Sequence, residues 1–280
     1  MSEKKKATIL CFHNRKGGVA KTNLCVNTAF IFSKDFKKKV LVIDTDTQIN
    51  STNFILSRVE NPERETIKDV VENKNLSVKD AIERADFPWV NEPINVYCLP
   101  GSRDPRRFSD TAWVKYENDT ISKICKEVEE DYDFIFIDTP PNTHSTISFS
   151  ALIASDYVIV PTELSNDSIE GIYWAQEDLE YIHEQKYNTK VDILGVIATR
   201  CSGSNEKDLS SAERENWLEL KENIPDLLSK IRIPIRKCVM NSTNAGIPVC
   251  YDGRSASGYL DYKNTSIQIR EWLKKKGAWK

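Results

Sequence analysis

Short apolar runs alternate with longer amphipathic stretches along most of this 280-residue chain. The apolar runs predict β-strands at 7–12, 39–44, 94–99, 133–138, 156–161 and 191–198, with a short strand near 231–233. The amphipathic stretches predict helices near 21–33, 66–73, 78–85, 117–130, 145–154, 168–186, 208–223 and 259–276. Several of the runs are apolar throughout, which is typical of strands covered on both faces of a sheet.

This alternation predicts βαβ units and therefore an α/β fold, with a mainly parallel twisted sheet flanked by helices on both faces. The chain contains no internal repeat, low-complexity tract or linker rich in Pro and Ser. We therefore expect a single domain that spans residues 1–280.

Composition indicates a globular protein of the cytosol. Hydrophobic residues make up 40% and charged residues 29% of the chain, and no apolar run approaches the roughly 18 residues of a membrane span. The seven cysteines are scattered and form no C-x-x-C pair. This pattern favours reduced core cysteines over a disulfide framework or a zinc site.

Residues 15–23, Arg-Lys-Gly-Gly-Val-Ala-Lys-Thr-Asn, lie between the first predicted strand and the first predicted helix. A strand, a glycine loop and a helix are the context of a phosphate-binding loop. Gly17 and Gly18 allow several backbone N–H groups to face one anion, and the helix that follows adds the positive end of its dipole. Lys21 is then placed for the β- and γ-phosphates of a nucleotide, and the Thr22 hydroxyl for Mg²⁺.

Acidic residues stand where two of the predicted strands end. Asp44 and Asp46 follow the run at 39–43, and Asp138 follows the run at 134–137. Ligands bind at the carboxyl edge of an open α/β sheet. Asp44 is therefore a candidate to orient or deprotonate an attacking water, and Asp46 to act through Mg²⁺ and its waters. Asp138 is a candidate acceptor for a Mg²⁺-bound water or for Thr22.

The glycine loop departs from the usual pattern G-x-x-x-x-G-K-[ST], because Arg15 and Ala20 occupy its two glycine positions. It fits the variant x-K-G-G-x-G-K-T better, with Lys16 as an additional cation. With the acidic pair and the I-D-T-P-P stretch at 137–141, the chain resembles the deviant Walker A ATPases of the ParA/MinD family from about residue 7 to residue 273. Thr47 stands where the family's D-x-D-P-Q segment has proline.

The resemblance implies a slow, switch-type ATPase that converts ATP to ADP and phosphate with Mg²⁺. It implies that Lys16 crosses a two-fold interface to the partner's phosphates, so that a homodimer sandwiches ATP. Lys16, Lys21 and Asp44 are then the expected catalytic residues, and Thr22, Asp46 and Asp138 the expected metal site. The expected nucleotide contacts are Lys16, Gly17, Gly18, Val19, Ala20, Lys21, Thr22, Asn23 and, as an adenine wall by family spacing, Pro248.

Charge is distributed unevenly around the formal net value of −3. Residues 230–280 contain 7 Lys and 4 Arg against 2 Asp and 1 Glu, a net of +8, so the remainder carries −11. A basic C-terminal face suits nucleic acid or anionic lipid. For double-stranded DNA held non-specifically through its phosphates, the candidate contacts are Arg232, Arg236, Lys237, Arg254, Lys263, Arg270 and Lys274.

The leading hypothesis is thus a partition ATPase of the short ParA type. Its ATP dimer would bind DNA in the cytoplasm at the nucleoid, and a centromere-binding, ParB-like adaptor would stimulate hydrolysis. Because the chain starts almost directly at its phosphate loop, we expect no N-terminal helix-turn-helix domain.

Three alternatives stay open. A MinD-like membrane-cycling ATPase needs a C-terminal amphipathic helix, and residues 267–276 have some of that character. However, Ile269, Trp272 and Leu273 also suit a helix packed on the sheet, and this use is favoured. An ATP-gated metal or electron carrier needs paired cysteines at a dimer axis, and a non-enzymatic module would leave three nucleotide-site elements unused.

Overall fold

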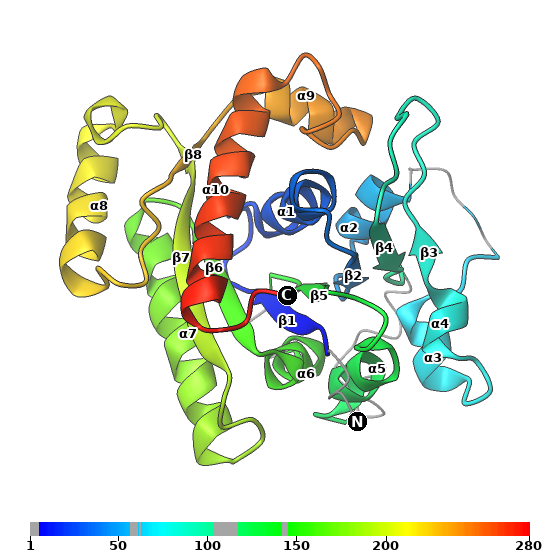
Figure 1. Cartoon of the computed structure of the whole chain (residues 1–280). Coiled ribbons are helices and arrows are strands. Elements are labelled where there is room, and N and C mark those ends of the chain that lie inside the picture. The colour runs from blue at the N-terminus through cyan, green and yellow to red at the C-terminus, as the bar shows by residue number, and fades with distance from the viewer. Residues whose placement is uncertain (1–5, 57–60, 62, 104–116, 142–144) are drawn as a thin grey trace.

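The computed structural model describes residues 6–56, 61, 63–103, 117–141 and 145–280. Its centre is an eight-stranded sheet in the order β3-β4-β2-β5-β1-β6-β7-β8 (Figure 1). All neighbouring strands in this sheet are parallel except β3 and β4. The strands are β1 (Thr8–Phe12), β2 (Val40–Asp44), β3 (Glu83–Arg84), β4 (Val96–Leu99), β5 (Phe134–Asp138), β6 (Tyr157–Thr162), β7 (Asp192–Cys201) and β8 (Ile233–Pro234).

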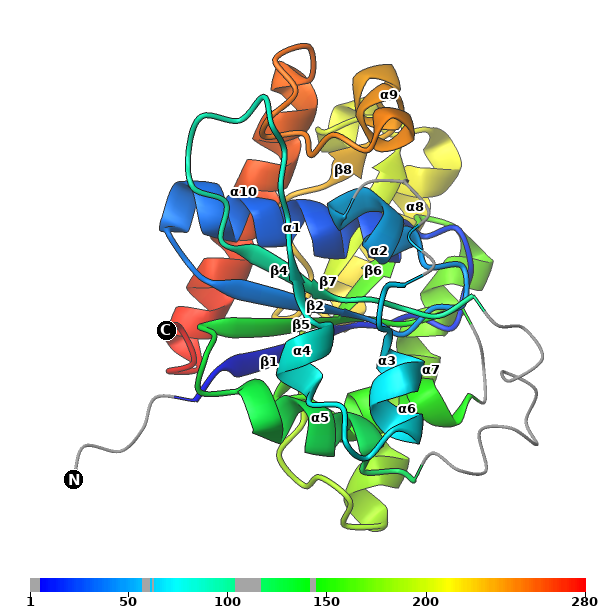
Figure 2. The same cartoon turned by 90° about the vertical axis from the view of Figure 1, so that its right-hand side faces the viewer.

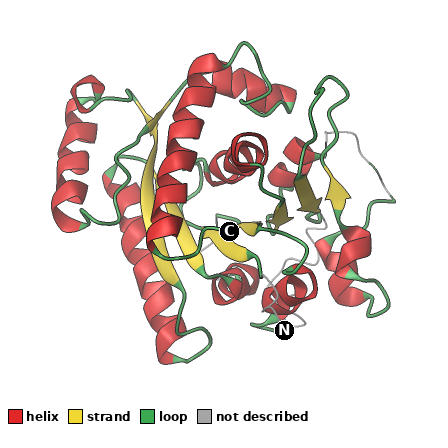
Figure 3. Cartoon of the chain, in the orientation of Figure 1, coloured by secondary structure: helices red, strands yellow, loops and turns green. Residues whose placement is uncertain are grey.

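Helices cover both faces of the sheet, as the colouring of Figure 3 shows. Each face has its own cluster of buried apolar side chains. One face carries α1 (Lys21–Phe36), α2 (Asn50–Ile55), α9 (Lys237–Ala245) and α10 (Ala256–Lys275). The other carries α3 (Ile67–Glu72), α4 (Val78–Ala81), α5 (Thr120–Val128), α6 (Thr146–Ala154), α7 (Asn166–Glu184) and α8 (Ser211–Asn223). The predicted fold class is therefore confirmed.

Three elements differ from the prediction. The helix expected over 78–85 ends at Ala81, because residues 83–84 pair with β4 as an antiparallel edge strand. The short helix α2 was not predicted, since its sequence, Asn-Ser-Thr-Asn-Phe-Ile, contains residues of low helix propensity. Helix α9 was also missed, and only two residues separate it from β8.

The register of three central strands places the candidate site. β5 lies between β1 and β2, and Asp138 is aligned with both Phe12 and Asp44. The phosphate loop that follows β1 and the two strand-end carboxylates therefore share one edge of the sheet. This is the carboxyl edge expected to bind ligands in such folds.

Helix α10 packs on β7 and against α1. Ile269, Trp272 and Leu273 are 0%, 8% and 0% exposed, as expected for a helix that packs on the sheet. A Cβ at Gly195 of β7 would lie 2.3 Å from the Trp272 ring, so the close approach of α10 requires glycine there. Within the described residues, no helix is both long enough and apolar enough to span a membrane.

Candidate nucleotide site

The phosphate loop joins β1 to α1 through two residues with left-handed backbone. Gly18 has φ 85°, which glycine adopts readily. Ala20 has φ 60° and ψ 29° and is the N-cap of α1. Ala20 therefore adopts a left-handed backbone conformation, which is sterically unfavourable for a residue with a Cβ. Ala20, which stands where the family variant has glycine, thus has a backbone in the left-handed region that glycine favours.

A cavity of about 610 Å³ opens above this loop. The loop and the start of α1 contribute Gly18, Ala20, Lys21, Thr22 and Asn23 to its lining. The Lys21 ammonium donates to the Lys16 carbonyl at 2.9 Å. Burial lowers the pKa of Lys21, and the charges of Asp138 and Asp46 oppose that shift. The lysine predicted to hold phosphates thus lies inside the cavity, next to the loop backbone.

Asp138 and Thr22 form the part of the site that fits a metal ion. The Thr22 hydroxyl donates to Asp138 Oδ2 at 2.7 Å. Asp138 Oδ1 is buried and has no hydrogen-bond partner among the described residues. A buried carboxylate oxygen without a donor is costly, and a cation would satisfy it. With Asp46 in the cavity lining, these residues offer the oxygen donors that Mg²⁺ prefers, so they fit this ion.

Asp44 is held away from the cavity by the first turn of α2. Its Oδ2 accepts from the Thr52 backbone N–H at 2.8 Å and from the Thr52 hydroxyl at 2.7 Å. The Ser51 hydroxyl donates in the same way to Asp138 at 2.7 Å. Ser51 and Thr52 were missed in the sequence. The signal for them was the stretch at 47–53, in which every side chain except Ile49 is a hydroxyl or an amide.

Burial raises the pKa of both strand-end carboxyls, and the charge of Asp138 raises that of Asp44 further. Hydrogen bonds from Thr52 at Asp44, and from Ser51 and Thr22 at Asp138, oppose the rise. A general base that works near neutral pH needs a pKa raised in this direction. The pKa of Asp44 is therefore raised in the direction that the predicted role needs, but its carboxylate is buried, bonded to Thr52 and absent from the cavity lining, so that role stays a prediction.

The far end of the cavity is polar. Arg200, Thr243 and Asn244 line it, and the Thr243 hydroxyl donates to Asn23 Oδ1 at 3.2 Å. Pro248, the predicted adenine wall, is not among the described residues that line the cavity. Its role stays a prediction, whereas Arg200 and two residues at the end of α9 do line the cavity.

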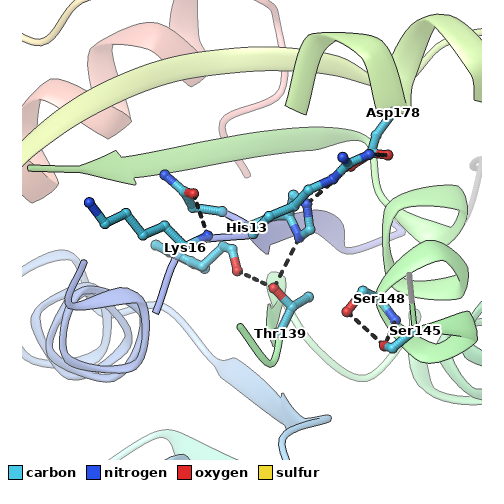
Figure 4. A network of polar contacts seen from close by, with 9 residues as sticks. His13, Lys16, Thr139, Ser145, Ser148 and Asp178 are labelled. Carbon is cyan, nitrogen blue, oxygen red and sulfur yellow. Dashed lines mark hydrogen bonds and ion pairs between the residues drawn. The ribbon is translucent and has the colours of Figure 1, made fainter. Parts of the chain in front are cut away.

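Two hydrogen bonds hold the Lys16 backbone, whereas its side chain points away from the other residues labelled in Figure 4. Its N–H donates to Asn14 Oδ1 at 2.9 Å, and its carbonyl accepts from Lys21. The side chain is 29% exposed, and its ammonium lies 3.7 Å from Asp167, whose side chain is 89% exposed. Lys16 is not among the described residues that line the cavity.

Val19 and Gly17, two further predicted nucleotide contacts, face neighbouring parts of the chain. The Val19 carbonyl accepts from the Thr199 hydroxyl at 3.0 Å, and the Val19 side chain is buried. A Cβ at Gly17 would lie 3.5 Å from Pro141, so this glycine faces the turn after β5. These two residues therefore join the loop to neighbouring strands.

Most of the candidate DNA contacts already have partners. Arg232 stacks on Trp217 at 4.2 Å and is only 9% exposed. Carboxylates lie within ion-pair distance of five others, namely Arg236, Arg254, Lys263, Arg270 and Lys274. Lys237 is exposed at the first position of α9. The structure does not gather the seven residues into one patch of free charge.

Comparison with known families gives one match over most of the chain. A family model described as an AAA domain matches residues 7–193. The chain is 26% identical to the sporulation initiation inhibitor protein Soj of Bacillus subtilis, over 90% of this chain and 95% of Soj. It is 27% identical to a ParA family protein of Mycoplasma pneumoniae, over 79% of this chain and 84% of that protein.

Solved structures share the fold. A variant of McdA from Cyanothece in complex with ATP has a TM-score of 0.79 at 22% identity, covering 96% of this chain and 97% of that one. A putative plasmid partition protein from Borrelia burgdorferi bound to AMPPNP has a TM-score of 0.73 at 21% identity, covering 97% of this chain and 100% of that one. The cell division ATPase MinD of Pyrococcus furiosus has a TM-score of 0.70 at 22% identity, with 95% and 99% covered.

Proposed function

Because this chain belongs to the ParA/MinD family of P-loop ATPases, we propose that it is a partition-type ATPase. In this proposal its Mg-ATP form is a homodimer that binds double-stranded DNA, and hydrolysis releases the DNA. A ParB-like adaptor stimulates that hydrolysis, and the protein acts at the nucleoid. ATP and AMPPNP in two structures of the same fold support ATP as the nucleotide.

The position of Lys16 carries the proposal. A lysine that served only its own nucleotide would line its own cavity, as Lys21 does. Lys16 instead has a fixed backbone and a partly exposed side chain, and its one ion pair within the described residues is with an exposed carboxylate. Exposed ion pairs of this kind contribute about 0–1 kcal/mol, so the ammonium can exchange Asp167 for a partner's phosphate at little cost.

Each residue of the site then has a role in hydrolysis. Mg²⁺, when bound, neutralises developing charge on the phosphates, and Thr22, Asp138 and Asp46 would hold it and its waters. Lys21 binds the phosphates of its own nucleotide, and Lys16 those of the partner's. Asp44 orients or deprotonates the attacking water.

DNA binding finds its best support at one end of the molecule. The turn after α1 carries Lys37 and Lys38, and the last turns of α10 carry Arg270, Lys274 and Lys275. We call these five residues the α1–α10 basic cluster. Lys38 lies 5.2 Å from the Trp279 ring, and Arg270 lies 4.7 Å from the Phe36 ring, so the two segments are neighbours. Figure 2 shows the end of α1 and the C-terminus on the same side.

The α1–α10 basic cluster joins two of the predicted DNA contacts, Arg270 and Lys274, to lysines from a distant segment. Glu271 is the acidic residue paired with Arg270 and Lys274. A surface of this charge attracts phosphates without reading bases, and its affinity should fall steeply with salt.

The membrane-cycling alternative gains no such support. Binding in the membrane interface requires an apolar helix face that is free to enter the lipid. In α10 the apolar residues Ile269, Trp272 and Leu273 are buried on the sheet. The same packing supports a single domain, because α10, near the end of the chain, contacts both β7 and α1, the first helix of the chain.

The experiment that tests the proposal compares DNA binding with and without Mg-ATP. We expect wild type to bind DNA only with Mg-ATP, because the dimer joins two basic surfaces. Asp44→Ala should stay bound, since it cannot hydrolyse ATP. Lys16→Ala should lose both dimerisation and DNA binding. Electrophoretic mobility shift and light scattering report the two properties.

Lys126→Ala is the matched control, because Lys126 is an exposed lysine on α5, away from the cavity lining. It should behave as wild type. Equal DNA binding with and without ATP in every variant would contradict the proposed switch.

A further inference from the structure

One face of helix α7 lies along the residues that lead into Lys16. Four residues of α7 at intervals of four, three and four form a single stripe on a helix. They are Asp167, Gly171, Trp174 and Asp178. Each meets the segment at 13–16: Asp167 pairs with Lys16, Gly171 packs on Asn14, Trp174 faces Arg15, and Asp178 contacts Arg15 and His13.

Arg15 and Asp178 make the strongest of these contacts. Arg15 Nε donates to Asp178 Oδ2 at 3.1 Å, and a second guanidinium nitrogen donates to Oδ1. The side chains are 13% and 14% exposed, and the Arg15 guanidinium lies 5.9 Å from the centre of the Trp174 ring. A bidentate, largely buried ion pair of this kind fixes both the orientation of the guanidinium and its distance from the carboxylate.

Asp178 also faces the strand end below the loop. His13 Nε2 lies 3.4 Å from Asp178 Oδ2, and His13 Nδ1 is 3.2 Å from the Thr139 hydroxyl, next to Asp138 (Figure 4). Burial alone would raise the pKa of Asp178, but the nearby His13 ring and the two hydrogen bonds from Arg15 bring it below its usual value. Asp178 is therefore a carboxylate at neutral pH.

These contacts fix the backbone on both sides of Lys16. Before it, Arg15 is anchored to α7, and Asn14 donates to the Pro161 carbonyl at 2.9 Å while accepting from the Lys16 N–H. After it, Lys21 donates to the Lys16 carbonyl. The Lys16 side chain, in contrast, has one ion pair within the described residues, with the exposed Asp167. Holding a reacting group in this way lowers the entropic cost of its productive contact.

We propose that Asp178, acting through Arg15, is a positioning residue that directs Lys16 toward the nucleotide of the partner subunit. The inference rests on the proposed function, because it requires that Lys16 act across a dimer interface. In this proposal Asp178, in the middle of α7, and Arg15 position Lys16 without touching the nucleotide themselves. Neither residue lines the nucleotide cavity within the described part of the chain.

The test separates positioning from a merely structural role. Asp178→Asn keeps the shape of the side chain and removes its charge. We expect the dimer dissociation constant, from sedimentation velocity in Mg-AMPPNP, to rise about ten- to hundredfold. The affinity of the monomer for a fluorescent ADP should stay within about twofold, because Lys21 and Gly18 are untouched. A structural role would weaken both together and lower the melting temperature.

Two further variants keep the test decisive. Arg15→Lys retains the charge but removes the two-pronged geometry, so it should weaken the dimer in the same direction. Exchanging the charges, Arg15→Asp with Asp178→Arg, should restore part of the dimerisation that Asp178→Asn removes. Glu180→Gln removes an exposed charge from the same helix and is the matched control, with no expected change.

The outcomes distinguish the two proposals. If wild type dimerises and Asp178→Asn dimerises equally well, the positioning role is wrong and the proposed function survives. Parallel losses of dimerisation and ADP affinity would also overturn it. If wild type stays monomeric in Mg-AMPPNP, the proposed function fails, and the positioning role fails with it.

Discussion

At the scale of single residues, the site depends on two left-handed positions in the phosphate loop. Gly18 adopts its positive φ without a side chain, whereas Ala20 does so with one. Left-handed backbone costs a non-glycine residue about 1–2 kcal/mol. The chain therefore keeps a nucleotide loop with local strain at the N-cap of α1.

Ala20→Gly should remove that strain. Glycine also gains freedom in the unfolded chain, which costs about 0.5–1 kcal/mol, so we expect a net stabilisation of up to about 1 kcal/mol. The melting temperature should then rise by about 2 °C, measured by calorimetry. Gly18→Ala is the reciprocal control, because nothing lies within 4 Å of the added Cβ and only the backbone opposes it. It should be destabilising, and a stabilising Gly18→Ala would contradict the argument.

At the scale of elements, two helices outside the phosphate loop, α2 and α7, hold residues of the site in place. The first turn of α2 provides one hydroxyl to each strand-end carboxylate, from Ser51 to Asp138 and from Thr52 to Asp44. Helix α7 holds the segment at 13–16 from the other side of the sheet. Neither helix is part of the phosphate loop, yet both set the geometry that the loop needs.

The fit between α7 and the loop predicts the effect of Gly171→Ala. Alanine normally stabilises a helix by about 1 kcal/mol relative to glycine. Here the added Cβ would lie 2.3 Å from Asn14 Oδ1, and overpacking of this kind costs about 1–3 kcal/mol. We therefore expect a net loss of stability and weaker nucleotide binding, measured by denaturant unfolding and by fluorescent ADP.

Gly253→Ala is the control for that variant, because nothing lies within 4 Å of its Cβ. Its stability should change by less than about 0.5 kcal/mol. If Gly171→Ala is as stable as wild type and binds ADP equally well, α7 does not hold Asn14 as described.

At the scale of the whole molecule, the α1–α10 basic cluster and the nucleotide cavity lie in different places. The nucleotide cavity lies at the carboxyl edge of the sheet, where Asp44 and Asp138 end their strands. The α1–α10 basic cluster lies where α1 and α10 end, beside the residues that lead into β2. We therefore expect that the proposed DNA binding can be altered without altering hydrolysis.

Lys37→Gln with Lys38→Gln should weaken DNA binding of the Mg-ATP form and leave ATP hydrolysis without DNA unchanged. The slope of log affinity against log salt should become shallower by about 0.9 for each DNA phosphate that the variant no longer neutralises. Fluorescence anisotropy with labelled duplex DNA measures both the affinity and the slope. Lys126→Gln with Lys207→Gln removes two exposed lysines elsewhere and should leave the slope unchanged. An unchanged slope in the Lys37 and Lys38 variant would show that these two lysines do not contact DNA phosphates.

Local patterns in the sequence determined the fold class and the loop that carries Lys21 and Thr22. Alternating apolar runs specify strands and helices, and a glycine loop between a strand and a helix acts through backbone groups that are neighbours in the chain. The same holds for acids that end strands, such as Asp138, because parallel strands bring their ends to one edge.

Only the tertiary structure decided what depends on distant segments. It placed Thr52 on Asp44, Asp178 on Arg15, and Lys38 beside the end of α10. It also paired Arg236 with Asp261 and buried Arg232, which composition alone had counted as free charge. The physical reason is that side-chain pairing and burial are set by packing between elements, and a sequence pattern describes one element at a time.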